Sequence, residues 1–490
     1  MEELRDFGTI ILVVAGGFSL ALLSSKLTER FPIPAPALFL VAAAIASDLF
    51  PALSEQISIR DVERIGTVAL IVILFDGGMG VGMRRLREAA WPIVSLGVVG
   101  TFGTAAVVAA FGHWALGFDW TTAWLLGAVL APTDPAVMFS VLGNREVGGR
   151  SGTILEGESG ANDPVGIALV LGVLELATHD DASAWSIAAD FSASMVLGLA
   201  VGVLGAITLL PVMRRVSLPS EGLYPIRVLA AAGVVYAAAT VVGGSGFLAV
   251  FVTGILISEA RAPYKGDIKG FHTSLASLAE VVVFVTLGLT IDLGSIFAER
   301  QWLDGILVAL VLTLVARPLV VGLLLLPARL QLEERLFVAW SGLKGAVPIL
   351  LGTFVLLAGV TEAERLYGIV FVVVAFSVLV EGSSIPLVAR RLGIPMETVA
   401  QEPFGVSIRL RADPELRRFV VAAGSAAEGR AIRELPIDEH SWISLVVRRG
   451  EARQARGEFR LDADDEVLLL SDAEDVGGLG ELFELSRSPR

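Results

Sequence analysis

Long apolar runs recur along the chain from residue 7 to about residue 390, with short polar connections between them. Each run can cross roughly 30 Å of hydrocarbon as a helix. The pattern predicts an all-α polytopic membrane protein with about thirteen transmembrane helices. The predicted spans are residues 7–25, 34–50, 62–80, 89–112, 120–143, 153–177, 185–213, 223–242, 245–260, 271–292, 301–328, 331–359 and 363–389.

Beyond about residue 400 the apolar runs become short and alternate with polar positions, as in Ser441–Val447 and Asp465–Ser471. Such alternation is typical of half-buried strands. The segment is long enough for one small core. We therefore expect a transmembrane domain over residues 1–395, a linker over 396–412 and a small α+β cytoplasmic domain over 413–490.

Composition supports the membrane assignment. With 54% hydrophobic residues, 18% charged residues and a mean hydropathy of +0.73, the chain is too apolar for an ordinary soluble protein. The absence of cysteine excludes disulfides and thiolate metal sites. A formal net charge of -14 argues against nucleic acid as a partner.

Lysine and arginine are divided unevenly between the two alternating sets of connections. One set contains sixteen basic residues, and the other set, together with the N-terminus, contains five. Because cytoplasmic connections carry the excess of basic residues, the N-terminus is expected outside and the C-terminus in the cytoplasm. The expected location is the inner (plasma) membrane.

Two of the predicted spans contain helix breaks. In the fifth span, Thr133 and Asp134 lie between two prolines that each remove an amide donor, so the carbonyls of Ala128 and Ala131 are expected to be free. In the twelfth span, Lys344 lies in the sequence S-G-L-K-G-A-V-P. Two interrupted helices in corresponding positions of two halves indicate a secondary transporter with inverted repeats and a midplane site. The halves are spans one to six and eight to thirteen.

The sixth span carries the hexapeptide E-S-G-A-N-D. The helical offset of four places Glu158 over Asn162 and Ser159 over Asp163. An acid at membrane depth is costly and usually marks an ion or proton path. Asp163 can bind a proton or an alkali cation, and competition between the two at one carboxylate is the simplest mechanism of exchange. Thr133, Ser159 and free carbonyls are expected to supply further oxygen ligands.

Other buried charges allow structural interpretations. Glu158 is expected to form a salt bridge, with Arg317 or Lys344 as its partner. Glu280 and Lys344 are expected to be a buried pair rather than a transport site. Asp76 could equally be an interfacial acid or part of the ion path. Thr133 and Asp134, at the break in the fifth span, are expected to belong to the ion path, and the alternative for this break is a proline kink with a capping aspartate.

Enzymatic alternatives are weak. The sequence G-E-S-G at 157–160 formally matches an intramembrane serine protease, but none of the four histidines is predicted at membrane depth. Neither a cofactor nor a metal beyond an alkali cation is predicted. A cation channel with a cytoplasmic gating domain is the main alternative, although the chain lacks a filter sequence such as T-V-G-Y-G. No role is predicted for Glu381 or Asp292.

Four motifs, taken together, point to a family. T-D-P in span five, E-S-x-x-N-D in span six, F-D-G-G in span three and G-L-K-G-A-V in span twelve resemble the monovalent cation:proton antiporter superfamily, in its NhaP and NHE-like branch. The resemblance covers residues 1–395. It implies exchange of potassium or sodium for protons, dimerisation and an elevator-like movement of the core.

The resemblance also implies roles for individual residues. Asp163 would carry the ion, and Asn162 would be the neutral partner that accompanies electroneutral one-for-one exchange. The remaining implied positions are Thr133 and Asp134 in the unwound crossover, Ser159 and Asp76 along the ion path, and Glu158 with Arg317 as a buried bridge. At Lys344 the chain departs from the family, which usually has arginine there.

The C-terminal segment resembles the TrkA-C half of a potassium-conductance regulator domain, in the sequence G-S-A-A-E-G-R-A-I-R-E-L-P and the strands that follow it. Together with F-D-G-G it resembles bacterial cell-volume-regulation potassium:proton antiporters. No G-x-G-x-x-G follows a strand in residues 400–490, so NAD binding is not predicted. A small regulatory ligand and a simple dimer contact both remain open for this domain.

Overall fold

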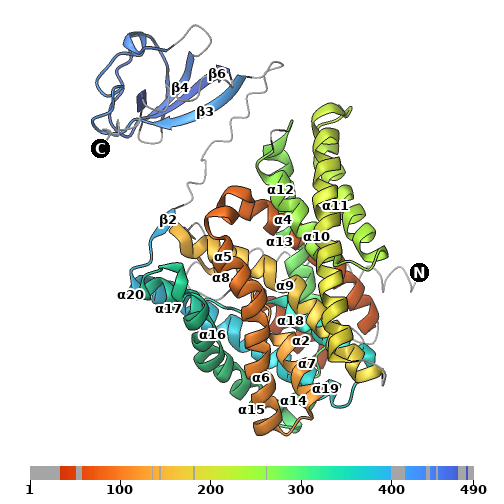
Figure 1. Cartoon of the computed structure of the whole chain (residues 1–490). Coiled ribbons are helices and arrows are strands. Elements are labelled where there is room, and N and C mark those ends of the chain that lie inside the picture. The colour runs from red at the N-terminus through yellow and green to blue at the C-terminus, as the bar shows by residue number, and fades with distance from the viewer. Residues whose placement is uncertain are drawn as a thin grey trace, which may run out of the picture. The chain divides into compact units, whose positions relative to one another are not determined.

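The computed structural model divides the chain into two compact units, residues 1–400 and 401–490, and each is described by itself. The first unit is helical and the second contains a small sheet (Figure 1). The structure describes residues 34–50, 58–134, 136–142, 145–179, 183–260, 262–398, 414–437, 442–448, 451–472 and 482–483.

The first unit confirms the predicted polytopic architecture. Eight of its helices are long and apolar enough to cross a membrane, and shorter apolar helices accompany them in the described part of the chain. One or more helical elements coincide with each predicted span from 34–50 onward. The first predicted span, 7–25, lies outside the described residues, so the count of thirteen stays a prediction.

The elements of the first unit follow one another with short connections. Their bounds are α2 (Ala35–Leu49), α4 (Ile59–Glu88), α5 (Ala90–Val94), η1 (Ser95–Gly100), α6 (Thr101–Leu116), α7 (Trp120–Leu130), α8 (Ala136–Leu142), β1 (Arg145–Val147), α9 (Gly149–Thr178), α10 (Ala184–Arg215), α11 (Leu223–Val241), α12 (Gly246–Ser258), α13 (Lys265–Leu289), α14 (Leu293–Ala298), α15 (Gln301–Val311), η2 (Leu312–Ala316), α16 (Arg317–Leu324), η3 (Leu326–Ala328), α17 (Leu332–Trp340), α18 (Ala346–Ala358), α19 (Ala363–Phe376), η4 (Ser377–Gly382), α20 (Ser383–Leu392) and β2 (Met396–Thr398). Strands β1 and β2 pair antiparallel.

Local sequence explains where several helices begin and end. Asp119 caps α7, since its Oδ2 accepts hydrogen bonds from the amides of Thr121 and Thr122 at 2.9 and 3.1 Å. Gly117, with φ of 78°, ends α6 in the left-handed conformation that glycine adopts readily. The break that separates α11 from α12 contains Gly243, which also has a positive φ of 79°.

Both predicted helix interruptions are present. One lies between α7 and α8, and the other lies between α17 and α18. The two unwound segments contact each other through their backbones, because the amide of Asp134 donates to the carbonyl of Leu343 at 2.8 Å. This bond satisfies polar backbone that could not be left unpaired at membrane depth.

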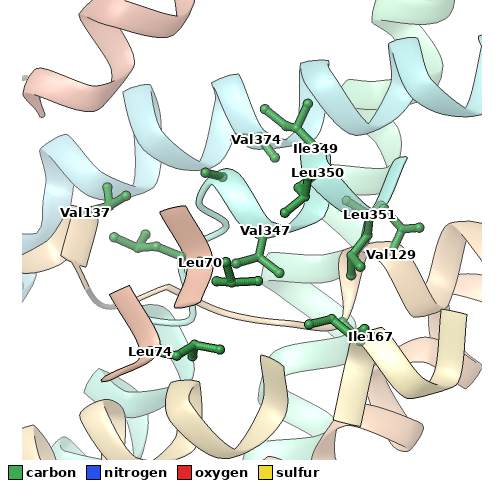
Figure 2. Packing of buried hydrophobic residues seen from close by; sticks show 14 of the residues in the cluster. Leu70, Leu74, Val129, Val137, Ile167, Val347, Ile349, Leu350, Leu351 and Val374 are labelled. Atoms are coloured by element: carbon green, nitrogen blue, oxygen red, sulfur yellow. The ribbon is translucent and has the colours of Figure 1, made fainter. Parts of the chain in front are cut away.

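Helices α4, α9 and α18 pack against one another (Figure 1). Figure 2 shows side chains from their shared apolar cluster, among them Leu70 of α4, Ile167 of α9 and Leu350 of α18. The second glycine of the F-D-G-G motif has a packing role, since a Cβ on Gly78 would collide with the backbone oxygen of Phe251 in α12. The motif therefore allows α4 and α12 to approach closely.

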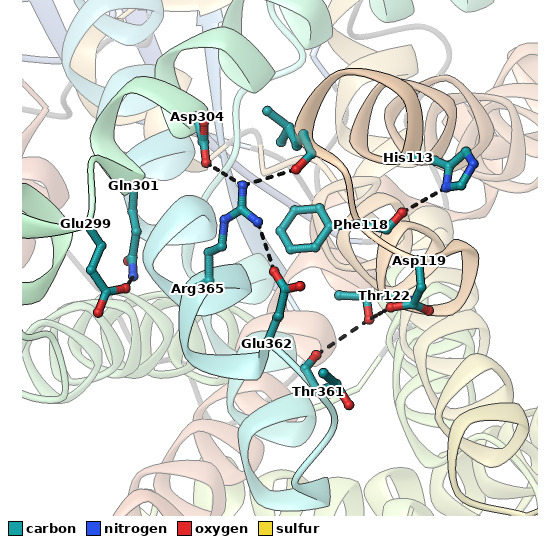
Figure 3. A network of polar contacts seen from close by, with 11 residues as sticks. His113, Phe118, Asp119, Thr122, Glu299, Gln301, Asp304, Thr361, Glu362 and Arg365 are labelled. Carbon is teal, nitrogen blue, oxygen red and sulfur yellow. Dashed lines mark hydrogen bonds and ion pairs between the residues drawn. The ribbon is translucent and has the colours of Figure 1, made fainter.

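Polar contacts around one arginine connect three parts of the helical unit (Figure 3). Arg365 of α19 donates to Glu362 at 2.8 Å, to Asp304 of α15 at 2.9 Å and to the carbonyl of Leu116 at 3.2 Å. Its guanidinium also lies over the ring of Phe118, 4.5 Å from the centroid. The cluster thereby ties the α6–α7 turn, from the first half, to α15 and α19, from the second half.

The second unit confirms the predicted strand-containing domain. Its strands are β3 (Pro414–Val420), β4 (Trp442–Arg448), β5 (Glu451–Gln454) and β6 (Glu466–Asp472), with the short turn η5 (Ile432–Glu434). The sheet order is β3-β6-β4-β5 and the pairings are antiparallel. Val446, Val467, Leu469 and Phe483 form much of its small core.

Candidate functional site

The largest group of predicted site residues lines one cavity of the helical unit. This cavity has a volume of about 660 Å³ and is bordered by α4, α9, α13, α18 and the unwound segment after α7. The predicted residues on its wall are Asp76, Asp134, Ser159, Asp163 and Glu280. The structure therefore brings together acids that are far apart in sequence.

Asp163 is a buried acid with an oxygen that lacks a hydrogen-bond partner among the described residues. It is 4% exposed, and its Oδ1 has no hydrogen-bond partner within the described ranges. Ser159 lies one turn earlier on α9 and is also buried. A buried carboxylate without a partner is costly, so it favours a bound proton or cation. The carboxylate and hydroxyl oxygens here are the ligand type that hard cations prefer.

Asn162 connects α9 to the first helix break. Its Nδ2 donates to Oγ1 of Thr133 at 2.7 Å, and both residues are buried. Neither residue is on the cavity wall. The contact therefore holds the unwound segment against α9 beside Asp163, and the predicted grouping of Thr133 with the cation ligands stays a prediction.

The carbonyls at the end of α7 are not free, contrary to the expectation from the prolines. Nζ of Lys344 donates to the carbonyls of Ala131 and Pro132, at 3.0 Å each. The carbonyl of Ala128 accepts from the amide of Ala131 at 3.4 Å. A positive group at the C-terminal end of a helix is favourable for the helix dipole, so Lys344 acts as a cap for α7.

Asp134 occupies the complementary position at α18. Gly345 precedes the first residue of α18, and a Cβ placed on it would collide with the carboxylate of Asp134. A negative group at a helix N-terminus is favourable, as a positive group is at the C-terminus of α7. Each broken helix thus receives a charged side chain from the other half of the protein.

The expected pair between Glu280 and Lys344 is not formed. The lysine reaches the α7 carbonyls instead, because these would otherwise be buried and unpaired. Glu280 lines the cavity, and its Oε1 has no hydrogen-bond partner in the part of the chain that the structure describes. The polar positions Thr273, Ser277 and Glu280 share one face of α13, and this spacing could have placed Glu280 on the cavity wall from sequence.

Asp76 of α4 also lines the cavity. Its Oδ1 accepts a hydrogen bond from Oγ1 of Thr273 in α13 at 3.0 Å, and the side chain is half-buried. The contact spans the cavity wall between two helices. Asp76 is therefore accessible from the cavity and joins α4 to α13 there.

Glu158 is paired with Arg317, not with Lys344. Nη1 of Arg317 lies 2.5 Å from Oε1 of Glu158, and the two side chains are 6% and 2% exposed. Nη2 also donates to the carbonyl of Val338 at 3.1 Å. The pair connects α9 with α16 and α17, as expected for a structural bridge. Removing one partner of such a buried pair is strongly destabilising.

One buried acid was assigned no role from the sequence. Glu381, in the π-helical turn η4, is 6% exposed and accepts a hydrogen bond from Ser377 at 2.5 Å. It also contacts the hydroxyl of Thr313 in η2. Its position near the end of a predicted span concealed this burial.

Comparisons with known proteins show the family of this chain. The family model described as "Sodium/hydrogen exchanger, transmembrane" matches residues 17–391, and the TrkA-C domain matches residues 416–484. The K(+)/H(+) antiporter NhaP of Alkalimonas amylolytica is 32% identical over 489 residues, which cover 98% of this chain and 84% of the relative. The K(+)/H(+) antiporter NhaP2 of Shewanella sp. (strain MR-4) is 30% identical over 470 residues, covering 95% and 81%.

Among solved structures, the sodium proton antiporter MjNhaP1 from Methanocaldococcus jannaschii at pH 8 is similar to this chain. The TM-score is 0.67 and the sequence identity is 25%. The similarity covers 78% of this chain and all (100%) of that chain.

Proposed function

Since the chain belongs to the transmembrane sodium/hydrogen exchanger family, we propose that it exchanges potassium or sodium for protons, one for one, at Asp163. It is a multi-pass cation:proton antiporter, not an enzyme. The relatives named as K(+)/H(+) antiporters favour potassium as a substrate, and the similarity to a sodium proton antiporter keeps sodium in the proposal.

The observation that carries the proposal is the unpaired oxygen of Asp163 on the wall of a large cavity. A proton or a cation bound there removes the cost of an uncompensated buried charge. The carboxylate cannot hold a proton and a cation at the same time, so binding of one ion releases the other. Ser159 and Asp134 are on the same cavity wall and could contribute further oxygens to the cation.

One-for-one stoichiometry is supported by the residue beside Asp163. Asn162 is neutral and is engaged with Thr133, so it adds no second titrating group next to the carboxylate. The carboxylate then has the same net charge with either ion bound. Transport of one cation for one proton moves no net charge.

The position of the cavities supports alternating access. The first cavity includes Gly80 and Thr273, close in sequence to the basic connections Arg84–Arg87 and Arg261–Lys269. By the positive-inside rule this end is cytoplasmic, which corresponds to an outside N-terminus and a cytoplasmic C-terminus in the inner membrane. A second cavity, of about 620 Å³, borders Arg60 at the other end of α4.

Side chains of one apolar cluster line both cavities, and we take this cluster as the barrier between them. Leu70 and Leu350 line the first cavity and Ile167 lines the second, and all three belong to the cluster in Figure 2. An elevator-like movement of α9 and the broken helices past this barrier would move Asp163 between the two sides. A homodimer would provide the stationary part of this mechanism.

The C-terminal unit is proposed to be regulatory. We assign the transmembrane domain to residues 1–395, the linker to 396–412 and the regulatory domain to 413–490. The TrkA-C match supports a small regulatory ligand. At the start of the linker, β2 pairs with β1, which lies between the first broken helix and α9, so a signal from the domain would reach the site by a short route.

The proposal is tested by flux measurements on the full chain in proteoliposomes. When potassium or sodium is more concentrated outside the proteoliposomes than inside, protons should move outward as the cation enters. The rate of this exchange should not change when the membrane potential is clamped to zero. The Asp163→Asn variant should lose this exchange. The control is Asp48→Asn, a change at an exposed position at the end of α2, which should leave exchange intact.

Cation-driven proton movement that survives in Asp163→Asn would contradict the role of this carboxylate. A rate that rises with membrane potential would contradict one-for-one exchange. Conduction of cations without any proton movement would instead favour the channel alternative, against which the family membership argues.

A further inference from the structure

Glu381 is a buried acid whose two oxygens are both engaged. Its Oε2 accepts a hydrogen bond from Oγ of Ser377 at 2.5 Å, and its Oε1 contacts Oγ1 of Thr313. Thr313 lies in the π-helical turn η2, and the other two residues lie in the π-helical turn η4. Such turns are rare and occur frequently at functional sites. The arrangement joins two helices of the second half through one carboxyl group.

Ser377 extends this contact to the second helix break. Its Oγ accepts a hydrogen bond from the backbone amide of Lys344 at 2.9 Å. The side chain of Lys344 in turn holds the carbonyls of Ala131 and Pro132. Hydrogen bonds at the two ends of the Lys344 residue therefore connect Glu381, through the break between α17 and α18, to the end of α7.

The same serine-to-acid spacing appears in the two halves. Ser159 and Asp163 are four residues apart in the sixth predicted span, and Ser377 and Glu381 are four residues apart in the thirteenth. In each half, this helix is hydrogen-bonded to the interrupted helix before it. In the first half the contact is Asn162 to Thr133, at 2.7 Å.

The surroundings of Glu381 exclude a cation-binding role. The small cavity beside it has a volume of about 10 Å³, enough for about one water molecule. The basic side chains of Arg317 and Lys344 are part of its lining. Two cations next to the carboxyl group oppose entry of a third. By contrast, the cavity at Asp163 is large and has several acids on its wall.

We propose that Glu381 is a positioning residue for exchange, which holds the break at Lys344 through Ser377 and thereby keeps both broken helices in place beside Asp163. It acts by hydrogen bonding rather than by its charge. The inference rests on the proposed function, because the placement of the broken helices is tested through the concentration of cation that Asp163 needs for exchange.

The substitution Glu381→Gln keeps the hydrogen bonds. Its amide oxygen can accept from Ser377, and its amide N–H can donate to Thr313, whose own hydroxyl can donate to the carbonyl of Ala309 at 2.8 Å. Glu381→Leu removes these contacts, and Ser377→Ala removes the link to Lys344. The matched control is Ser383→Ala, since the Ser383 hydroxyl donates only to the carbonyl of Leu379 in its own helix.

The test measures the cation concentration that gives half-maximal exchange in proteoliposomes containing the full chain. Glu381→Leu and Ser377→Ala should each raise it roughly tenfold, the effect of one lost buried hydrogen bond. Glu381→Gln and Ser383→Ala should stay within roughly threefold of the unaltered chain. The double variant of Glu381→Leu and Ser377→Ala should be no worse than the more damaged single variant, because both break one connection.

Two results would overturn the inference. In one, Glu381→Gln is as damaging as Glu381→Leu, so the charge is what matters. In the other, Ser377→Ala has the same half-saturating cation concentration as Ser383→Ala. This second comparison still tests the inference if Glu381→Leu does not fold. Failure of the proposed function is distinguishable, since it appears in the unaltered chain or in Asp163→Asn, without any variant of Glu381.

Discussion

Asp163 and Glu381 occupy comparable positions in the two halves of the helical unit but have opposite surroundings. Each follows a serine by four residues and lies beside an interrupted helix. Asp163 leaves one oxygen unpaired on a cavity wall, whereas both oxygens of Glu381 are engaged by hydroxyl groups. From this difference we infer that a buried acid is available for transport when one of its oxygens has no hydrogen-bond partner. A buried acid whose oxygens are both hydrogen-bonded has a structural role instead.

The largest expected effect comes from turning a paired acid into an unpaired one. Arg317→Leu would leave Glu158 buried without its partner and destabilise the helical unit by about 3–5 kcal/mol. We expect a large loss of folded protein, measured by thermal unfolding in detergent. The control Arg390→Leu changes an exposed arginine and should unfold like the unaltered chain. Equal unfolding temperatures for the two variants would contradict a structural role for the pair.

The next effect concerns the lysine that joins the two halves. Lys344→Met keeps the apolar stem but leaves the carbonyls of Ala131 and Pro132 without their donor, at a cost of about 1–3 kcal/mol. We expect a lower unfolding temperature together with slower exchange. Lys269→Met, at an exposed position, is the control. If Lys344→Met exchanges at the normal rate, the cap on α7 is not needed for transport.

The C-terminal unit contains an acid–arginine pair outside the membrane-spanning helices, which can be compared with the buried pair of Glu158 and Arg317. Asp465 accepts hydrogen bonds from Arg448 at 2.8 and 2.6 Å. Burial raises the pKa of Asp465, but the hydrogen bonds and charge of Arg448 outweigh it and hold the pKa below its ordinary value. The stabilisation is therefore present above the ordinary carboxyl pKa of about 4 and is lost as the pH falls through the lowered value.

Arg448→Leu should remove this stabilisation, by about 1 kcal/mol because the arginine is partly exposed. Hydrogen exchange of strand β6 in the full chain measures the difference. At neutral pH the variant should exchange faster than the unaltered chain, and the two should converge at low pH. A difference that grows on acidification would have the wrong sign for a lowered pKa.

The smallest effect concerns a second acid with an unpaired oxygen. If such oxygens mark the ion path, Glu280→Gln should raise the half-saturating cation concentration by roughly threefold, about 0.7 kcal/mol, without abolishing exchange. Proteoliposome flux at a series of cation concentrations measures it. The exposed Glu364→Gln serves as control. An unchanged concentration dependence would limit the comparison to Asp163.

Much of the fold could be predicted from local sequence. Hydropathy located the described spans, and prolines located the break at Thr133 and Asp134. The bridge between Glu158 and Arg317 was also foreseeable, because a deeply buried acid needs a cation and few were available. These features depend on hydrophobic periodicity or on the cost of burying a charge, and both can be read from the order of residues along the chain.

Other features depend on contacts that the sequence does not encode locally. The carbonyls to which Lys344 binds are more than two hundred residues away, so the pair with Glu280 was a reasonable but wrong expectation. The burial of Glu381 involves a π-helical turn, which shifts the faces of the helix away from the ordinary 3.6-residue period. Whether an acid is left unpaired can be seen only once all its neighbours are in place.

Competition of a cation and a proton for Asp163 is the central claim, and it can be measured without transport. Purified full-length protein in weakly buffered detergent is titrated with potassium or sodium chloride while the solution pH is recorded. The account predicts release of close to one proton per cation bound, and no release from Asp163→Asn. Cation binding without proton release by the unaltered chain, or undiminished release by Asp163→Asn, would contradict it.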